Sequence, residues 1–314
     1  MHRPPDPALW TGRADPGEGP RALRWHQRVA PWRPGAEAGL ALVGFASDAG
    51  VARNGGRTGA AEGPAALRRA LGNVAWHRRG PAWDAGDVVC EGDGLEAAQA
   101  ELGTLVARLL GEGQRVVVLG GGHEVALGTF LGLAEHAARS SPAPRLAVVN
   151  VDAHLDLREG SLPTSGTPFR DVARACEARG WTFRYLCLGL DEDANTGALL
   201  ETAARLGAAF VPDRTLLERG AGWARDAVAA FLEGVDRVHL SIDLDALPAA
   251  VAPGVSAPAA RGLPLHLVEA IADAVAASGR LAVADVAELC PRLDPDDRTA
   301  RAAARLAARL AGRE

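Results

Sequence analysis

From Gly39 onward the chain alternates short apolar runs with longer stretches rich in Ala, Leu and Arg. Several of the short runs are uninterrupted, as expected of strands that are covered on both faces. The longer stretches have the apolar spacing of amphipathic helices. Repetition of this unit is typical of helices wound around a parallel sheet. The pattern therefore predicts an α/β fold, a single three-layer α/β/α domain with a mostly parallel sheet.

The same pattern places the individual elements. The expected strands are Leu40–Phe45, Arg115–Leu119, Leu146–Val151, Phe183–Leu188, Ala209–Val211, Val238–Ile242 and Leu281–Val286. The expected helices are Pro64–Leu71, Leu95–Leu110, Glu124–Ala138, Arg170–Arg179, Thr196–Leu206, Trp223–Leu232, Leu265–Ala277 and Asp297–Ala311. Residues 1–38 are rich in proline and lack this periodicity, so we expect an irregular N-terminal arm, with residues 39–314 forming the domain.

Composition excludes several classes of function. The chain has no lysine, which removes Schiff-base chemistry and the lysine of a Walker A phosphate loop. Its net charge is −5 and its arginines are dispersed, whereas nucleic-acid binders carry a basic stripe. We therefore expect no nucleic-acid partner.

The four cysteines are far apart and form no C-x-x-C pair, so we expect reduced thiols. No apolar run has the length of a membrane helix, and the first residues lack the apolar core of a signal peptide. These features predict a cytoplasmic protein without a membrane partner.

Polar residues follow three of the expected strands. The segments Gly120–Glu124, Asp152–Asp156 and Asp243–Asp245 each begin where an apolar run stops. Ligands of open parallel sheets bind at the carboxyl ends of the strands, so these segments are expected to meet. Side chains two apart in extended backbone share a face, which aligns the acidic residues of each segment.

Four aspartates converging on one crevice repel one another strongly unless protons or cations compensate them. Two divalent ions would balance four carboxylates, and one would not. Imidazoles and carboxylates without a thiolate suit Mn²⁺, with nickel, cobalt and iron as alternatives. A dinuclear site activates water for attack on an electrophilic carbon, so the sequence predicts a hydrolase.

Each segment alone has a simpler explanation. An Asp-x-Asp at a strand end is often a turn or helix cap, and a histidine in a glycine loop is often a hydrogen-bonded polar residue. The glycine run Gly120–Gly122 could bind phosphate, although it lacks the G-x-G-x-x-G spacing. The joint placement at three strand ends favours the metal site.

These segments resemble the ureohydrolase family, which includes the arginases and agmatinases. That family carries a Gly-Gly-x-His turn, an Asp-x-His-x-Asp segment and a Ser-x-Asp-x-Asp segment around two manganese ions. Here they correspond to Gly120–His123, Asp152–Asp156 and Ser241–Asp245. The resemblance covers the chain from Gly39 on and implies an arginase-like domain with two Mn²⁺ per subunit. The implied metal ligands are His123, Asp152, His154, Asp156, Asp243 and Asp245.

Within that family the chain is similar to the formimidoylglutamases, which hydrolyse N-formimidoyl-L-glutamate to L-glutamate and formamide in histidine degradation. The segments that carry this closer match are Gly50–Ala60 with Glu62–Pro64, Arg158, Ser165–Phe169 and Asn195–Thr196. The resemblance implies a small dianionic amidine as substrate, and we also expect a homo-oligomer.

Arg158 favours that substrate on physical grounds as well. The arginases have a neutral asparagine at the matching position, and a guanidinium can hold a carboxylate through two parallel hydrogen bonds. Formimidoylglutamate is a dianion, whereas agmatine is a dication that Arg158 would repel. The alternative is a surface arginine paired with Asp171 or Glu159.

The resemblance also assigns two catalytic residues. Asp156 is the candidate for positioning the attacking hydroxide and relaying its proton, and Glu288 for orienting the protonated amidine. Ser165 replaces a histidine that is thought to shuttle protons in agmatinase-like members, so the proton of the leaving amine has another source. His239 and His266 are possible but more often structural. The weaker candidates for binding the amino-acid end, which turn chemistry explains equally well, are Asn54, Arg57 and Asn195.

Three other functions stay open at this point. A guanidine hydrolase of the same family, acting like an arginase, agmatinase or guanidinobutyrase, would release urea. A catalytically silent metal-binding paralogue would keep the ligands without the reaction. A related zinc deacetylase would need an adjacent pair of histidines, which the sequence lacks.

Overall fold

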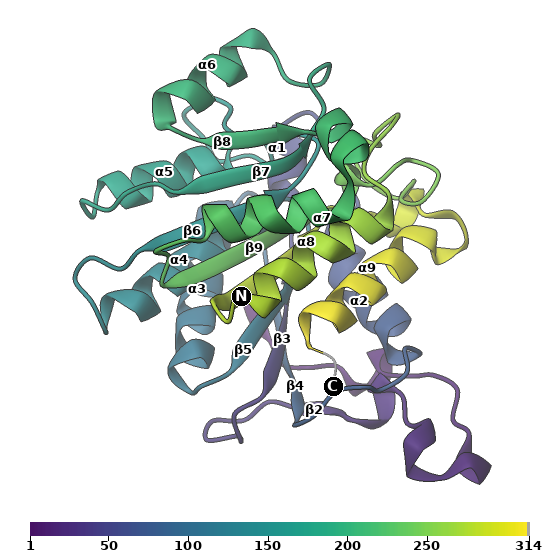
Figure 1. Ribbon diagram of the computed structural model, residues 1–314. Helices are drawn as coiled ribbons and strands as arrows, with labels where there is room; N and C mark the ends of the chain where they lie inside the picture. Colours follow the sequence, from purple (N-terminus) through teal and green to yellow (C-terminus); the bar gives the residue numbers. More distant parts are fainter. Residues whose placement is uncertain (313–314) are drawn as a thin grey trace.

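A computed structural model describes residues 1–312 of the chain. The strands form one ten-stranded sheet. Helices lie on both sides of this sheet (Figure 1). The strands are β1 (His2–Arg3), β2 (Val29–Pro31), β3 (Leu40–Ala46), β4 (Ala82–Val89), β5 (Arg115–Leu119), β6 (Leu146–Val151), β7 (Tyr185–Leu190), β8 (Ala209–Pro212), β9 (Arg237–Asp243) and β10 (Leu281–Ala287). The predicted three-layer α/β/α fold is confirmed.

The order of the strands is β1-β4-β3-β5-β10-β9-β6-β7-β8, with β2 also paired to β4. Every pairing is parallel except that of β1 with β4. The sheet interior is apolar on both faces because successive side chains alternate between them. Leu40 and Leu42 of β3 pack on one side, and Ala41 and Val43 pack on the other.

Helices cover both faces of the sheet. Those that pack against one face are α2 (Gly63–Gly72), α7 (Asp213–Phe231), α8 (Leu265–Ala277) and α9 (Arg298–Leu310). Those against the other are α3 (Leu95–Gly111), α4 (Val125–Ala138), α5 (Pro168–Glu177) and α6 (Gly197–Leu206). A further short helix, α1 (Ala49–Arg53), follows β3. Within residues 1–312, no helix combines the length and the apolar character needed to cross a bilayer.

The N-terminal arm and one edge of the sheet differ from the sequence-based expectation. Within residues 1–38, expected to be irregular, β1 and β2 both pair with β4. β4 is an unexpected strand, because its segment Ala82–Val89 contains two aspartates and a glycine, residues that are uncommon in strands. Sequence periodicity cannot reveal that a partner elsewhere in the chain neutralises such aspartates.

Other boundaries differ as well, most clearly in β7 and α7. β7 begins and ends two residues later than the expected Phe183–Leu188. α7 begins at Asp213, ten residues before the expected start, because two helical segments join across Gly220, whose φ of 77° is left-handed. α5 begins and ends two residues earlier than the expected Arg170–Arg179.

A buried ion cluster explains how β4 forms a strand despite its two aspartates. Arg68 of α2 is only 1% exposed and contacts both oxygens of Asp84, with N···O distances of 2.8 and 2.9 Å. It also contacts Asp87 at 2.7 Å. The indole of Trp10 donates to Asp84 at 2.7 Å, so the cluster ties the N-terminal arm to the sheet.

We expect Arg68→Ala to lower the free energy of unfolding by about 3–5 kcal/mol, because it leaves the Asp84 carboxylate buried without its cation. Urea denaturation measures the loss. Arg69→Ala, at the exposed neighbouring position, is the matched control and should change the free energy by less than about 0.5 kcal/mol. Equal effects of the two substitutions would contradict this account of the cluster.

Candidate metal centre

The carboxyl ends of four adjacent strands converge at one edge of the sheet. In the order β5, β10, β9 and β6, these strands are direct neighbours. His123 follows β5, Glu288 follows β10, Asp243 ends β9 and Asp152 follows β6. The strand ends thus lie side by side as expected, and β10 places Glu288 between those that carry the candidate metal-binding motifs.

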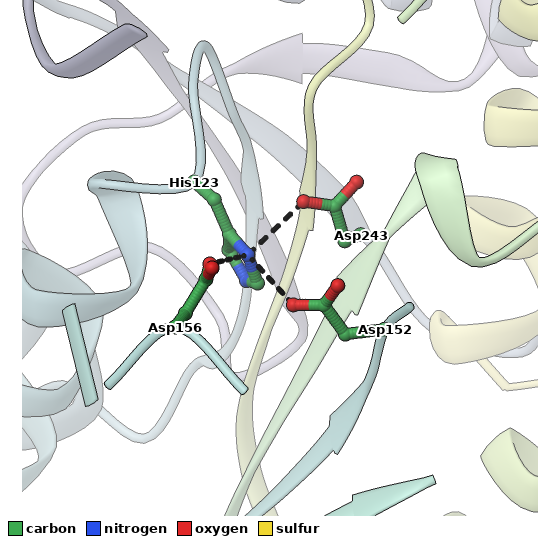
Figure 2. Close-up of side chains that lie close together, drawn as sticks. All are labelled: His123, Asp152, Asp156 and Asp243. Atoms are coloured by element: carbon green, nitrogen blue, oxygen red, sulfur yellow. Dashed lines mark ion pairs between the residues drawn. The ribbon is translucent and has the colours of Figure 1, made fainter. Parts of the chain in front are cut away.

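Three carboxylates surround one imidazole nitrogen (Figure 2). The Nδ1 atom of His123 lies 2.8 Å from Asp156 Oδ2, 3.0 Å from Asp243 Oδ2 and 3.2 Å from Asp152 Oδ2. All four side chains are buried. Together they form a group whose ligand atoms are close enough to bind a single ion.

A second group shares one of these residues. His154 Nδ1 lies 3.2 Å from Asp245 Oδ2 and 3.4 Å from Asp152 Oδ1. Asp152 therefore presents one oxygen to each group. The structure brings together all six residues that the family resemblance implies as ligands, in two groups joined by Asp152.

The hydrogen bond of His123 engages Nε2 and leaves Nδ1 as the atom that could bind a metal ion. Its Nε2 lies 2.9 Å from Ser241 Oγ, and the Ser241 hydroxyl donates to Asp285 at 2.5 Å. The serine proton is directed at Asp285, so Ser241 Oγ accepts from Nε2–H. His239, named above as a possible proton donor, contacts the other Asp285 oxygen at 2.5 Å and is fully buried beneath the site. The carboxylate–hydroxyl–imidazole chain thus orients a candidate metal ligand from behind.

Orphaned polar atoms show that the residues suit cations. Within residues 1–312, His123 Nδ1 and Asp245 Oδ1 are buried without a hydrogen-bond partner. Burial, together with the charge of Asp245, raises the pKa of Asp243 well above its usual range. Burial and the charge of Asp152 raise the pKa of Asp156 to about 6. Buried carboxylates clustered in this way are stabilised when divalent ions replace the protons.

Backbone strain occurs at the two residues proposed as catalytic. Asp156 has φ 52° and Glu288 has φ 69°, left-handed values that non-glycine residues rarely adopt. Outliers of this kind cost free energy and cluster at functional sites. The glycine turn before His123 is equally constrained, because a Cβ on Gly121 would lie 1.9 Å from the carbonyl oxygen of Ser47.

The Glu288 carboxylate faces two ways. Its Oε1 accepts a hydrogen bond from the backbone N–H of His123 at 2.8 Å, whereas its Oε2 is buried without a partner. Burial and the nearby Glu124 carboxylate raise the pKa of Glu288 to about 8. Glu288 therefore holds the His123 turn with one oxygen and keeps the other available.

Arg158 has the surroundings expected of an anion-binding side chain. It is exposed, and within residues 1–312 its guanidinium makes no ion pair or hydrogen bond. Its possible partners are engaged elsewhere: Asp171 with Arg170, and Glu159 with other arginines. A Cβ on Gly166 would lie 2.7 Å from the Arg158 side chain and 3.3 Å from Asn54 Nδ2, so Gly166 brings these two candidates together.

The remaining candidates have other partners. Ser165 is buried beside Gly166, in the loop that faces Arg158. Arg57 donates to the carbonyl oxygens of Val255 and Ser256. Asn195 uses both ends of its amide on backbone groups of residues 153, 155 and 191. The structure therefore gives Arg57 and Asn195 loop-holding contacts, consistent with the turn explanation.

Several residues around the site were not singled out from the sequence. Arg170 donates to the carbonyl oxygens of Arg158 and Gly160 and so fixes the backbone beneath the candidate substrate arginine. Asp285 lies inside an apolar strand run, where a charged residue is unusual, and that position was the available signal. Arg170 had no comparable signal, because its contacts depend on the loop path.

Metal binding is expected to release protons. Without metal, the pKa values of Asp243 and Asp156 are raised. The pKa values of the His123 and His154 imidazoles are raised too. At His123 burial lowers the pKa but the nearby carboxylates raise it more, and at His154 the charge of Asp245 is the largest cause. Protons compete with the metal, so Mn²⁺ affinity should fall as pH falls through about 6, the pKa of Asp156. Calorimetry in buffers of different ionisation enthalpy measures the released protons. Identical heats in all buffers would contradict this expectation.

Comparison with known proteins agrees with this geometry. The model of the arginase family matches residues 38–312. A formimidoylglutamase of Ralstonia nicotianae is 52% identical over 313 residues, 99% of this chain and 96% of that protein. The structure of a formimidoylglutamase from Bacillus subtilis superimposes with a TM-score of 0.82 at 22% identity, covering 93% of this chain and 92% of that one. A Trypanosoma cruzi formiminoglutamase with Mn²⁺ gives 0.77 at 26% identity, covering 88% and 95%. The chain belongs to the arginase family.

Proposed function

We propose that this chain hydrolyses the amidine C–N bond of N-formimidoyl-L-glutamate to give L-glutamate and formamide, in histidine degradation, with two Mn²⁺ bound per subunit. The observation that carries the proposal is an unpaired arginine, Arg158, two residues after the ligand Asp156. A relative that is 52% identical over nearly its whole length bears the name formimidoylglutamase.

The six ligands provide the reaction centre. Two divalent ions held by them would lower the pKa of a water molecule and supply hydroxide to the amidine carbon. Asp156, whose carboxylate lies 2.8 Å from His123 Nδ1, accepts the water proton and passes it to the leaving amine nitrogen. Glu288 accepts N–H bonds of the protonated amidine at its free Oε2 and so orients the carbon for attack.

The amino-acid end of the substrate needs recognition of two carboxylates. Arg158 holds one of them through a bidentate pair, and the Asn54 amide beside Gly166 donates to the same end. Ser165 adds a hydroxyl in the same loop. The charge of Arg158 favours a substrate with two carboxylates and disfavours agmatine, which carries two positive charges.

Product analysis tests the proposal. The manganese-loaded protein should convert formimidoylglutamate into equal amounts of formamide and glutamate, and the metal-stripped protein should not. Arginine, agmatine and guanidinobutyrate are the control substrates, with urea as the product to be measured. Urea release without formamide would favour the guanidine hydrolase, and the absence of any turnover with bound manganese would favour the silent paralogue.

The expectations on location and assembly belong to the same proposal. We expect the chain to act in the cytoplasm and to form a homo-oligomer. Light scattering of the purified protein measures the assembly, and a molecular mass of one chain would contradict that part.

A further inference from the structure

A fully buried amide supports the carboxylate shared by the two ligand groups. Asn150 lies on β6 two residues before Asp152, which follows the strand, and their side chains are in contact. The Asn150 Nδ2 lies 2.9 Å from Asp152 Oδ2, the oxygen that faces His123. The opposite amide orientation would place an oxygen against a carboxylate, so the N–H₂ group is the one that donates.

The same amide nitrogen also contacts a tyrosine hydroxyl. Tyr185 of β7 is buried, and its Oη lies 3.1 Å from Asn150 Nδ2. The hydroxyl donates its proton to the carbonyl oxygen of Leu155 at 2.9 Å, so it accepts from Asn150. The hydrogen bonds therefore run from Leu155 through Tyr185 and Asn150 to Asp152. They begin and end within the segment Asp152–Asp156, which carries three of the six ligands.

These contacts also restrain the strained residue of that segment. Both backbone polar groups of Leu155 are hydrogen-bonded. Its carbonyl oxygen accepts from Tyr185, and its N–H donates to Asn195 at 3.0 Å. The next residue is Asp156, with φ 52°. The Tyr185 ring packs on Phe169, which contacts the His123 imidazole edge-on with ring centroids 5.3 Å apart.

The buried amide of Asn150 is unfavourable for packing alone. Within the part of the chain that the structure describes, Asn150 Oδ1 is buried without a partner. Such an atom costs free energy, and a leucine or valine on the strand would avoid that cost. A polar group retained at such cost indicates a task at the site beside it.

We propose that Asn150 and Tyr185 are positioning residues that hold the Asp152 carboxylate and the Leu155 peptide in the geometry that receives the metal ions. This inference rests on the proposed dinuclear site. Neither residue touches the substrate in this role. Both act through Asp152 and through the backbone that leads to Asp156, so metal affinity should change before anything else.

In the test, the metal-stripped full chain is titrated with manganese. Binding is measured by calorimetry and by electron paramagnetic resonance of free Mn²⁺. Tyr185→Phe removes one hydroxyl and keeps the ring, and Asn150→Ala removes the amide. Each should weaken manganese binding by about 10- to 100-fold, the usual effect of losing a partner behind a metal ligand. Because the two residues act in one chain of hydrogen bonds, the double variant should lose less than the product of the single losses.

Thr129→Val is the matched control, because it also removes one buried hydroxyl that donates to a backbone carbonyl, in α4. It should lower the melting temperature of the metal-free protein about as much as Tyr185→Phe and leave manganese affinity unchanged. If Tyr185→Phe does not fold, Asn150→Ala still measures the effect on Asp152. Wild-type manganese affinity in the folded variants would overturn this inference alone. A wild-type chain that binds no manganese would overturn the proposed function as well.

Discussion

Asp243→Asn is expected to lower kcat by about 10³-fold or more, equivalent to about 4 kcal/mol of transition-state stabilisation. Asp243 Oδ2 lies 3.0 Å from His123 Nδ1, and its Oδ1 accepts from the Asp245 backbone N–H at 2.8 Å. An amide keeps the shape but removes one of the charges that hold the ions. Bound manganese, measured by atomic emission, should fall below two per chain.

The same substitution should stabilise the metal-free protein. Burial and the charge of Asp245 raise the pKa of Asp243 well above its ordinary value of 3.8. The stability that this group contributes is present below that ordinary value and is lost as pH rises through its folded-state pKa. Asparagine has no such loss, so the melting temperature of the metal-free variant should exceed that of the metal-free wild type, increasingly so as pH rises.

Asp236→Asn is the control, because Asp236 lies on the surface just before β9 and pairs with the exposed Arg145. It should keep wild-type activity and metal content. If Asp243→Asn retained full activity with two bound ions, Asp243 would not be a ligand and the assignment of the centre would be wrong.

Arg158→Asn is expected to reduce kcat/KM for formimidoylglutamate by about 10- to 100-fold, mostly through KM. A charge-assisted hydrogen bond contributes about 1.5–3 kcal/mol, and 1.4 kcal/mol corresponds to tenfold. Binding that is equal in the ground and transition states changes KM with little change in kcat. Steady-state kinetics separate the two constants.

Two comparisons make this experiment specific. Arg158→Lys keeps the charge but loses the planar fork, so its KM should be intermediate. Arg174→Asn, on the nearby exposed face of α5, removes an arginine that pairs with Glu159, and it should leave KM unchanged. An unaltered KM in Arg158→Asn would remove the carboxylate-binding role and with it the physical reason for a dianionic substrate.

The candidate ligands could be found from the sequence because each motif follows an apolar run. Parallel strands align their carboxyl ends, so residues such as His123, Asp152 and Asp243 meet without any knowledge of loop geometry. The fold class was predictable for the same reason. Periodicity decides which segments are strands, and burial on both faces decides that the sheet is parallel.

Contacts between elements that are distant in the sequence could not be predicted. Arg68 neutralises Asp84 from another element, so β4 has no apolar signature of its own. Asn195 matches a family segment, yet its hydrogen bonds to the backbone of residues 153, 155 and 191 depend on where two loops meet. The register between β9 and β10, which places Asp285 beside Ser241, is likewise a property of the folded sheet.

The position of β10 has a consequence for how this protein matures. β10 is the last strand along the chain, yet it lies between β5 and β9 in the middle of the sheet. A nascent chain still lacking β10 has β5 and β9 without their shared neighbour, so the ligands that follow these strands cannot yet meet. Pairings between such distant segments form slowly. The group around His123 therefore forms only once β10 has been added, near the end of synthesis.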